Sequence, residues 1–475
     1  MKLLIVGFGD FDENLRVVED LRKSHEISYW IFMKGVLAMD ATLFPHTVFH
    51  EYYDALKNIP PKEVTTDNFA PWGAEAITEY AGAEAEIMSM MDKWYPRWPV
   101  LKRKDFYYEM LRYWGGVLDQ FKPDAIVLAA VPHQMFDFVL YEIARRRGVR
   151  TIMLDPVFRG DRMVTYSDYR EGNEVLATWK QRARNTKLDE LAPSTRDYFL
   201  EISEPKDPSP AHFTEWKREN SGLHKLRRHA KSLVPFIKDG SIIERGVMRV
   251  FKMLKSNVRD EYLALERPAD LSKPYVYAPL HYQPELTTSP QGGIFVDQVL
   301  LMKTLSAALP KNWELYVKEH PAQWMAHGGD FTSYRYKGIY EEIARLPNVR
   351  LVPATTNTFT LIDNAKTVAT ATGTAAMEAV LRGKSALIFG YPWFMHAPGI
   401  FRVSCVLDCI KAFTCVAEGK HAGQQDVLDY LRVVEDASFR GYTASEGFRA
   451  ATYEKNEAWP EILKAVESEL RKWEK

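Results

Sequence analysis

Short apolar runs alternate with stretches of helical spacing in the first part of the chain. Residues 3–7 form a brief apolar run that ends at a glycine, which is typical of a buried strand in a parallel sheet. Helical spacing follows over residues 14–23, and residues 27–32 are predicted as a second strand. A strand at 122–130, a helix at 135–147 and a strand at 150–154 then form a βαβ unit.

The stretch between residues 49 and 104 interrupts this pattern with prolines and aromatic residues, and we expect an insertion of helices and loops there. The alternation starts again after Pro274. Strands are predicted at 275–280, 314–319, 349–352, 367–371 and 385–389, and helices at 297–308, 340–345, 374–382, 426–435 and 459–473.

The two regular regions predict an α/β protein with two Rossmann-like, doubly wound domains that face each other across a cleft. The length of 475 residues agrees with this, because a single hydrophobic core seldom organises so long a chain. We expect a first domain over residues 1–265 with helical insertions and a basic connector, and a second domain over 266–458. A C-terminal helix over 459–475 is a candidate to pack back on the first domain.

Charge is balanced over the whole chain but not locally. The formal net charge is -1, whereas residues 217–255 hold eleven Lys or Arg and three acids. Two interpretations of this basic segment stay open: a solvated helical connector, or a surface that contacts anionic lipid headgroups or a lipid-linked phosphate acceptor. No recognition motif for nucleic acid accompanies it, so nucleic acid is not predicted as a partner.

The cysteines and the N-terminus indicate an intracellular protein. Cys405, Cys409 and Cys415 have neither a metal-ligand nor a C-x-x-C spacing, and we expect buried free thiols, with Cys405 in the core. The first residues lack the pattern of a signal peptide, and no apolar run is long enough to cross a bilayer. We therefore expect a cytoplasmic protein that at most touches the inner face of the membrane.

Two segments of the second domain place polar side chains directly after a predicted strand. In the first, His281, Gln283 and Glu285 follow the strand at 275–280. In the second, the strand at 314–319 leads to Lys318, Glu319 and His320 before a stop at Pro321. Side chains alternate along a strand, so one of Lys318 and Glu319 is expected to face the protein interior. Pro321 favours an extended backbone at His320.

A third segment, Thr372-Gly373-Thr374, lies at a predicted strand-to-helix turn. Small and hydroxyl residues at such a turn expose backbone N–H groups to an anion such as a phosphate. Glu378 follows Thr374 by one helical turn, so both share a face and Glu378 can accept hydrogen bonds from ribose hydroxyls. In the alternative interpretation, Thr374 and Glu378 only cap the helix.

Three sequence segments together resemble a known family. The series LHYQPELTTSPQGG, VKEHP and ATATGTAAMEAVLRGKSALIFGYPWF is similar to bacterial capsular polysaccharide biosynthesis proteins. In particular it resembles GT-B glycosyltransferases that use CMP-activated sugars, the Kdo transferases and the bacterial sialyltransferases. The similarity covers roughly residues 275–394.

The resemblance implies roles for these residues. His320 would bind the CMP phosphate, the Thr372-Gly373-Thr374 turn would hold the phosphate side, and Glu378 would lie near the ribose. His281, Gln283, Lys318 and Pro321 complete the expected nucleotide-binding set. The resemblance also implies that no metal is needed. It implies no cofactor either, because the nucleotide sugar is a substrate. The sequence departs from the family in having Thr where the third motif has Ser, and in lacking a clear counterpart of the acidic motif in the first domain.

Candidate catalytic groups lie in the first domain, apart from Glu285. Asp10 follows Gly7-Phe8-Gly9, but the third glycine of a dinucleotide fingerprint is absent. His133 and Asp137 are four residues apart at a helix start, where they would share a face. Asp137 could deprotonate an acceptor hydroxyl or act as a nucleophile, or it could merely interact with the helix dipole.

We therefore expect a glycosyltransferase that moves a sugar from a nucleotide donor, CMP-linked by the resemblance, to a surface polysaccharide or glycolipid acceptor. The first domain would face the acceptor and the second would bind the nucleotide sugar. Two alternatives are a sugar-nucleotide epimerase of the same fold and a non-catalytic factor in capsule assembly or export.

Overall fold

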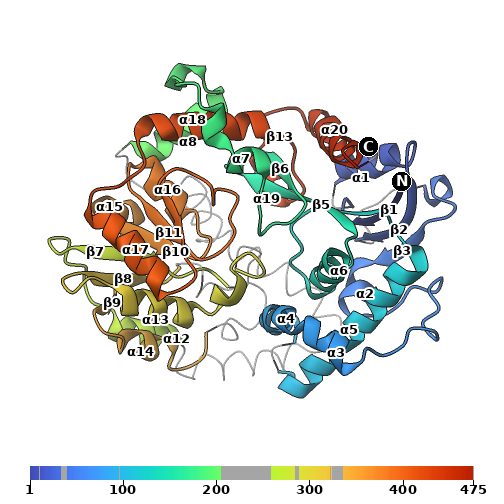
Figure 1. The fold of residues 1–475 in the computed structure, drawn as a ribbon, viewed down its shortest axis with the longest axis horizontal. Coiled ribbons are helices and arrows are strands. Elements are labelled where there is room, and N and C mark those ends of the chain that lie inside the picture. Colours follow the sequence, from blue (N-terminus) through green and yellow to red (C-terminus); the bar gives the residue numbers. More distant parts are fainter. Residues whose placement is uncertain are drawn as a thin grey trace, which may run out of the picture.

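The computed structural model describes residues 1–9, 11–33, 40–95, 97–204, 258–283, 288–320, 323 and 335–473. The described chain forms two α/β lobes, each built on its own sheet, as Figure 1 shows. The basic segment 217–255 and the candidates Asp10, Glu285 and Pro321 lie outside the described residues.

The first lobe is built on a seven-stranded sheet in the order β13-β6-β5-β4-β1-β2-β3. The strands from β3 to β5 run parallel, whereas β6 is antiparallel to both β5 and β13. The strands are β1 (Lys2–Val6), β2 (Glu26–Phe32), β3 (Val48–Glu51), β4 (Ala125–Leu128), β5 (Arg150–Val157), β6 (Arg162–Tyr166) and β13 (Phe439–Arg440).

Helices cover both faces of this sheet, because its strands are apolar on both sides. One face packs on α1 and α20, which contact each other although they come from opposite ends of the chain. The other face packs on α4, α5 and α6. The helices of this lobe are α1 (Asp12–Leu21), α2 (Tyr52–Leu56), α3 (Ala74–Glu79), α4 (Ala81–Trp94), α5 (Val100–Phe121), α6 (Met135–Arg146), α19 (Ser445–Ala450) and α20 (Ala458–Arg471).

The second sheet has six strands, all parallel, in the order β9-β8-β7-β10-β11-β12. Numbered within the lobe, this is 3-2-1-4-5-6, the order of the Rossmann fold. The predicted fold class is confirmed. The strands are β7 (Tyr275–Pro279), β8 (Glu314–Lys318), β9 (Val349–Leu351), β10 (Thr367–Thr370), β11 (Ala386–Ile388) and β12 (Ile400–Arg402).

Helices also cover both faces of the second sheet. α12, α13, α14 and α17 pack on one face, and α15 and α16 on the other. Near the junction of the lobes lie α7, α8 and α18 (Figure 1). These helices are α7 (Glu174–Ala177), α8 (Pro193–Ser203), α12 (Val258–Leu265), α13 (Gln298–Ala308), α14 (Ile339–Ala344), α15 (Thr358–Asn364), α16 (Ala375–Leu381), α17 (Val406–Ala417) and α18 (Gln424–Ala437).

The structure departs from the sequence predictions in three details. Residues 48–51, at the start of the supposed insertion, form the edge strand β3, which is too short for a periodic pattern to show. Cys405 is exposed rather than in the core, because it precedes α17, whose buried face begins at Cys409. β13 falls within the range 266–458 assigned to the second domain, yet it pairs with β6 of the first sheet.

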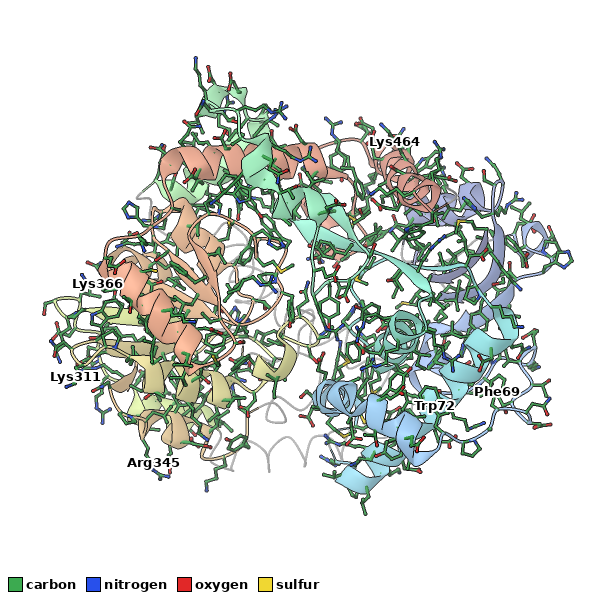
Figure 2. The ribbon with its side chains drawn as sticks, viewed as in Figure 1. Phe69, Trp72, Lys311, Arg345, Lys366 and Lys464 are labelled. Carbon is green, nitrogen blue, oxygen red and sulfur yellow. The ribbon has the colours of Figure 1, made fainter. Side chains whose placement is uncertain are left out.

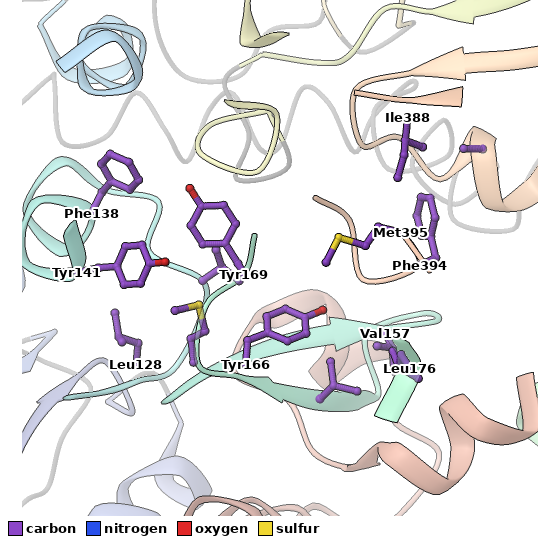
Figure 3. Close-up of a cluster of buried hydrophobic side chains, with 14 of the residues drawn as sticks. Leu128, Phe138, Tyr141, Val157, Tyr166, Tyr169, Leu176, Ile388, Phe394 and Met395 are labelled. Atoms are coloured by element: carbon purple, nitrogen blue, oxygen red, sulfur yellow. The ribbon is translucent and has the colours of Figure 1, made fainter. Parts of the chain in front are cut away.

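A single hydrophobic cluster runs through both lobes. It joins Tyr166 and Tyr169 of the first lobe to Ile388, Phe394 and Met395 of the second, as Figure 3 shows. Aromatic pairs cross the same junction: Tyr169 meets Tyr391 at 5.9 Å and Phe158 meets Trp393 at 5.6 Å between ring centroids. The two lobes therefore share part of their core.

A buried polar contact also crosses the junction. Asp155, at 4% exposed, accepts hydrogen bonds at Oδ2 from the Tyr166 hydroxyl, at 3.0 Å, and from Gln291 Nε2, at 3.3 Å. Gln291 belongs to the second lobe, so Asp155 ties a strand of one sheet to a loop of the other. Burial raises the pKa of Asp155 to about 7.

Close packing of helix α5 depends on Gly116. A Cβ atom there would lie 2.3 Å from Cγ of Phe69, whereas a Cβ on the helical Gly82 would meet nothing within 4 Å. We expect Gly116→Ala to lower the free energy of unfolding by about 1–3 kcal/mol, because the Phe69 ring must move. Gly82→Ala should raise it by about 0.5–1 kcal/mol, since alanine restricts the unfolded chain. Denaturant unfolding of both variants measures this, and equal stability would contradict it.

The stability of the junction should depend on pH. The folded state holds the Asp155 proton more tightly than the unfolded chain, so this group lowers the free energy of unfolding progressively as the pH rises from about 4 to about 7. Asp155→Asn should make this slope shallower by the contribution of Asp155, while Asp137, whose pKa burial also raises, continues to contribute. Asp408→Asn is the control, because hydrogen bonds from Ser404 lower the pKa of Asp408 and place its contribution below this window. Identical slopes in wild type and Asp155→Asn would contradict the assignment.

Candidate functional site

The order of the second sheet reverses between β7 and β10, and the segments after these two strands lie together. In an open parallel sheet, such a switch point leaves a crevice at the carboxyl ends of the strands, where ligands bind. β7 leads to His281, and β10 leads to the turn that contains Thr372, Gly373 and Thr374. The topology thus brings together two of the three segments that the sequence selects.

His281 holds the turn after β10 in place. Its Nε2 accepts hydrogen bonds from the backbone N–H groups of Ala371, at 3.2 Å, and Thr372, at 3.4 Å. The Thr370 hydroxyl lies 2.7 Å from the same nitrogen and accepts the N–H of Gly373 at 3.2 Å. Burial, with the nearby charges of His320 and Arg335, lowers the pKa of His281 to about 3, so the imidazole is neutral and its Nε2 can accept.

These contacts occupy backbone N–H groups that the sequence analysis assigned to an anion-binding turn. Three N–H groups that the sequence offers to a phosphate, at Ala371, Thr372 and Gly373, already have acceptors within the protein. Gly373 is close to the His281 ring rather than to an open space, because a Cβ there would lie 3.1 Å from Cε1 of His281. The close backbone approach is real, and its partner is a side chain of the same lobe.

The buried Lys318 and the half-buried Glu378 lie on the α15–α16 side of the sheet. Lys318 is 5% exposed, and its ammonium donates to the Thr356 carbonyl at 2.9 Å and to Thr358 Oγ1 at 2.5 Å. Burial lowers the pKa of Lys318 to about 8, against an opposing effect of Glu378. Burial raises the pKa of Glu378, and the Thr374 hydroxyl donates to its Oε1 at 3.1 Å.

Thr374 and Glu378 therefore share a face, as their spacing predicts. Thr374 makes no side-chain cap to the backbone of α16, so the simple capping interpretation does not describe it. Whether Glu378 meets a ribose stays a prediction.

Glu319 points to the opposite side of the sheet and is structural, as strand alternation requires for one of the pair. It is fully buried and pairs with Arg335, whose Nε donates to its Oε2 at 2.8 Å, while the Tyr340 hydroxyl donates at 2.5 Å. Arg335 also donates to the His281 carbonyl at 2.8 Å and to Gln283 Oε1 at 2.5 Å. This ion pair fixes the segments after β7 and β8 relative to each other.

A pocket of about 190 Å³ lies between the lobes and is lined from both sides. The first lobe contributes the end of α4, with Lys93 and Trp94, and the start of α6, with His133. The second lobe contributes Gln283 and Arg335. Further lining residues are Ser89, Met90, Asp92, Gln134, Met135, Thr288, Ser289, Val296, Asp297, Gln298, Val299, Tyr336 and Ile339.

His133 lines this pocket with its ring oriented by the backbone. Its Nδ1 lies 2.9 Å from the Val131 carbonyl oxygen, so Nδ1 carries the proton and Nε2 is an acceptor. Burial, together with the charge of Lys93, lowers the pKa of His133 to about 4. The ring is therefore neutral near pH 7.

Asp137 does not share this position. Its Oδ1 accepts the backbone N–H of Gln134 at 2.8 Å, as the third residue of helix α6 does in a capping box. The side chain is 5% exposed, burial raises its pKa to about 8, and it is not among the residues that line the pocket. Asp137 therefore interacts with its own helix start, as the alternative interpretation proposed. The expectation that Asp137 and His133 share a face toward the cleft is wrong.

His320 is exposed beside the same edge of the sheet. Its ring centroid lies 5.8 Å from that of Tyr282, and its charge contributes to the low pKa of His281. Gln283 is held by Arg335 and by its own donation to the Val296 carbonyl at 3.1 Å. Their roles toward a nucleotide stay predictions.

Sequence reasoning missed the residues that organise the site. Arg335 belongs to no recognisable motif, and only its distant partner Glu319 explains its burial. Gln298 is the first residue of α13, and its Oε1 accepts a hydrogen bond from the backbone N–H of His281 at 2.7 Å. Lys93 and Trp94 lie in the region taken for an insertion. The only sequence pattern that pointed to any of these contacts was the alternation of side chains along the strand, which predicted that one of Lys318 and Glu319 faces the interior.

Comparison with known proteins is informative for the second lobe. Residues 289–402 match the family model described as capsule polysaccharide biosynthesis protein. The segment runs from the pocket-lining Ser289 to the end of β12 and includes the turn held by His281. The resemblance to capsule polysaccharide biosynthesis proteins is confirmed. A sequence comparison with curated proteins finds no match.

Several solved structures are similar over most of the chain at low identity. The β-Kdo 2,7 transferase KpsC of Thermosulfurimonas dismutans is 12% identical, with coverage of 68% of this chain and 89% of that one and a TM-score of 0.28. HepE of Anabaena, in complex with UDP and glucose, is 10% identical, with coverage of 95% and 98% and a TM-score of 0.29. The UDP-GlcNAc 2-epimerase of Neisseria meningitidis, bound to UDP-GlcNAc, is 11% identical, with coverage of 99% and 100% and a TM-score of 0.26.

None of the helices formed by the described residues is long and apolar enough to cross a membrane. No cluster of three His, Cys, Asp or Glu side chains able to hold a metal ion occurs among the same residues.

The Glu319–Arg335 pair should be essential for stability. Glu319→Gln leaves the buried guanidinium without its counter-charge, and we expect the free energy of unfolding to fall by about 3–5 kcal/mol. Glu341→Gln is the matched control, because Glu341 pairs with Arg345 on the surface and should contribute about 0.5 kcal/mol or less. Chemical denaturation compares the two. A loss at Glu319 no larger than that at Glu341 would show that the pair is not an organising contact.

Proposed function

We propose that this protein is a GT-B glycosyltransferase that moves a sugar from a nucleotide donor to a surface polysaccharide or glycolipid acceptor. The observation that carries the proposal is the polar pocket between the lobes, next to the switch point of a Rossmann-ordered sheet. The family match of the segment that forms most of its second-lobe wall supports a place in capsule polysaccharide biosynthesis.

The size of the pocket bears on what it holds. Pockets for drug-sized ligands commonly measure about 300–1,000 Å³. At about 190 Å³, this pocket suits one part of a nucleotide sugar rather than the whole molecule. We assign the transferred sugar to it and the nucleotide to the neighbouring carboxyl edge of β7, β8 and β10, where His320 is exposed. A CMP donor rests on the sequence resemblance alone.

The groups in the pocket suit an inverting or retaining transfer without a metal. In the reaction the acceptor oxygen bonds to the anomeric carbon, the bond from that carbon to the phosphate oxygen breaks, and the nucleotide leaves with the electron pair. The acceptor hydroxyl must lose its proton, and His133 offers a neutral Nε2 held by its Nδ1 contact. The ammonium of Lys93 can balance negative charge on the leaving phosphate.

Asp137 is a poorer base than the sequence suggests. Its Oδ1 is used by the helix start, and its side chain is not among the residues that line the pocket. We therefore assign the acceptor-side proton to His133.

Nucleotide binding provides the direct test. Calorimetric titration with CMP and UDP should show binding of at least one of them. His320→Ala should weaken it about tenfold, the loss typical of one charged or hydrogen-bonding contact of roughly 1.4 kcal/mol. Asp137→Ala should leave nucleotide affinity unchanged and lower stability by about 1 kcal/mol through the lost cap.

Two results would contradict the proposal. Absence of binding by either nucleotide at millimolar concentration would remove its basis. A larger loss of affinity for Asp137→Ala than for His320→Ala would mean that donor and acceptor sides are exchanged. Turnover of a nucleotide sugar without any acceptor would instead favour the epimerase alternative.

A further inference from the structure

A second cavity, of about 830 Å³, lies within the first lobe and shares no lining residue with the pocket between the lobes. It is bounded by the loop before α3, by the second half of α5 and by the end of α6. We call it the outer groove, after its main lining residues Phe69, Trp72, Tyr80, Arg112, Arg146 and Arg147. Figure 2 labels Phe69 and Trp72 on the part of this lobe that lies away from the second lobe.

Two consecutive glycines let aromatic rings of the outer groove lie directly on the backbone of α5. A Cβ atom on Gly115 would lie 2.8 Å from Cζ2 of Trp72, and one on Gly116 would lie 2.3 Å from Cγ of Phe69. The Tyr80 ring meets that of Trp72 at 4.9 Å between centroids. Glycine inside a helix lowers stability relative to alanine, so this pair maintains the aromatic floor at a cost to the helix.

Each guanidinium of the outer groove already has a carboxylate partner. The pairs are Arg112 with Glu109, Arg146 with Glu142 and Arg147 with Asp119. Two of these cations also lie against rings, with the guanidinium carbon of Arg146 4.3 Å from the centre of Tyr80 and that of Arg147 5.9 Å from the centre of Trp72. The outer groove therefore offers fixed planar groups whose charges are largely compensated.

Exposed polar side chains form the rim of the outer groove. Asn68, Glu79 and Gln120 all line it and are exposed. Among the described residues, no hydrogen bond occupies the side-chain atoms of these three. The two amides can donate and accept, and the carboxylate can accept, so the rim presents both kinds of hydrogen-bonding group to a ligand. An aromatic floor under a few polar groups is the usual composition of a binding site for a small molecule.

We propose that the outer groove binds an oligosaccharide. A sugar ring has C–H faces that pack on aromatic rings, and hydroxyls that both donate and accept hydrogen bonds. A phosphate would need cations that are not already neutralised, and it would meet the carboxylates of Glu79 and Asp119. A lipid chain would bury the polar rim without hydrogen-bond partners. An oligosaccharide matches both the floor and the rim.

The outer groove and the pocket between the lobes lie at opposite ends of the same two helices. α4 begins directly after Tyr80 of the groove and ends at Trp94 of the pocket, whereas α6 begins directly after Gln134 of the pocket and ends at Arg146 of the groove. With 14 and 12 residues, these neighbouring helices set the two sites about 18–21 Å apart. One consequence rests on the proposed function: a growing glycan held in the groove would keep its end within reach of the pocket.

Binding of defined oligosaccharides to the full-length protein tests the proposal. The probe is a printed array of oligosaccharides from bacterial surface polysaccharides, followed by calorimetric titration with the oligosaccharide that binds best. We expect wild type to bind at least one of them, and more tightly than it binds the constituent monosaccharides. Trp72→Ala should weaken this binding about tenfold through the loss of ring stacking. Trp72→Phe keeps an aromatic face and should retain most of the affinity.

The exposed rim offers a variant that leaves the fold intact. Asn68→Ala/Gln120→Ala removes two amides and should weaken oligosaccharide binding about tenfold, while thermal unfolding stays as in wild type. Trp459→Ala is the control for Trp72→Ala, because Trp459 is also half-buried but packs on the other face of the first sheet. Gln181→Ala/Gln424→Ala removes two exposed amides elsewhere. Both controls should bind the oligosaccharide as wild type does.

Four results would overturn the proposal. The first is that no oligosaccharide of the array binds wild type. The second is that the rim variant binds like wild type, which would assign the glycan to another site such as the pocket between the lobes. The third is competition by inorganic phosphate, which would make the groove an anion site. The fourth is dissociation of an oligomer by the rim variant in gel filtration, which would make the groove a contact between copies.

Nucleotide titration keeps this proposal separate from the proposed function. The rim variant Asn68→Ala/Gln120→Ala should bind CMP and UDP as wild type does, because its two side chains lie about 18–21 Å of helix away from the pocket. Loss of oligosaccharide binding with unchanged nucleotide affinity is therefore the expected result. Nucleotide binding without any oligosaccharide binding would overturn the inference about the outer groove and leave the proposed function standing.

Discussion

The shared core between the lobes is the constraint on which the rest of the structure depends. Tyr166 and Tyr169 pack in one cluster with Phe394 and Met395, and Asp155 meets Gln291 across the same boundary. Close-packed apolar surface cannot be separated without exposing it to water, at a cost of about 25 cal/mol per Å². The distance between His133 on one lobe and Arg335 on the other is therefore set by packing, and the pocket between them is preformed.

Within the second lobe, buried polar groups stabilise different parts of the structure. At the end of β8, Lys318 points to one side of the sheet and donates to Thr356 and Thr358, while Glu319 points to the other side and pairs with Arg335. His281 then uses its ring to satisfy the turn after β10 and its backbone to meet Arg335. Much of the polar character at this edge of the sheet thus stabilises the edge itself.

The sequence predicted the fold well because parallel strands are buried on both faces. Uninterrupted apolar runs such as those around β4 and β7 are visible without any structure, and so is the restart after Pro274. The edge strands β3 and β13 are not visible in the sequence, because they are too short to show a periodic pattern of apolar residues. Three polar segments were found at strand ends, but which of their side chains serve the fold was not visible. That depends on partners far away in sequence, such as Arg335 for Glu319 and Gln298 for His281.

The strand β13 has a consequence for how the chain is made. Its two residues close the edge of the first sheet, yet a ribosome adds them only after all six strands of the second sheet. α20, which covers one face of that first sheet with α1, is added later still. During synthesis the N-terminal lobe therefore has an open sheet edge and a face covered only in part, by α1, until β13 and α20 are added. The lobe made second is the first to have all its parts.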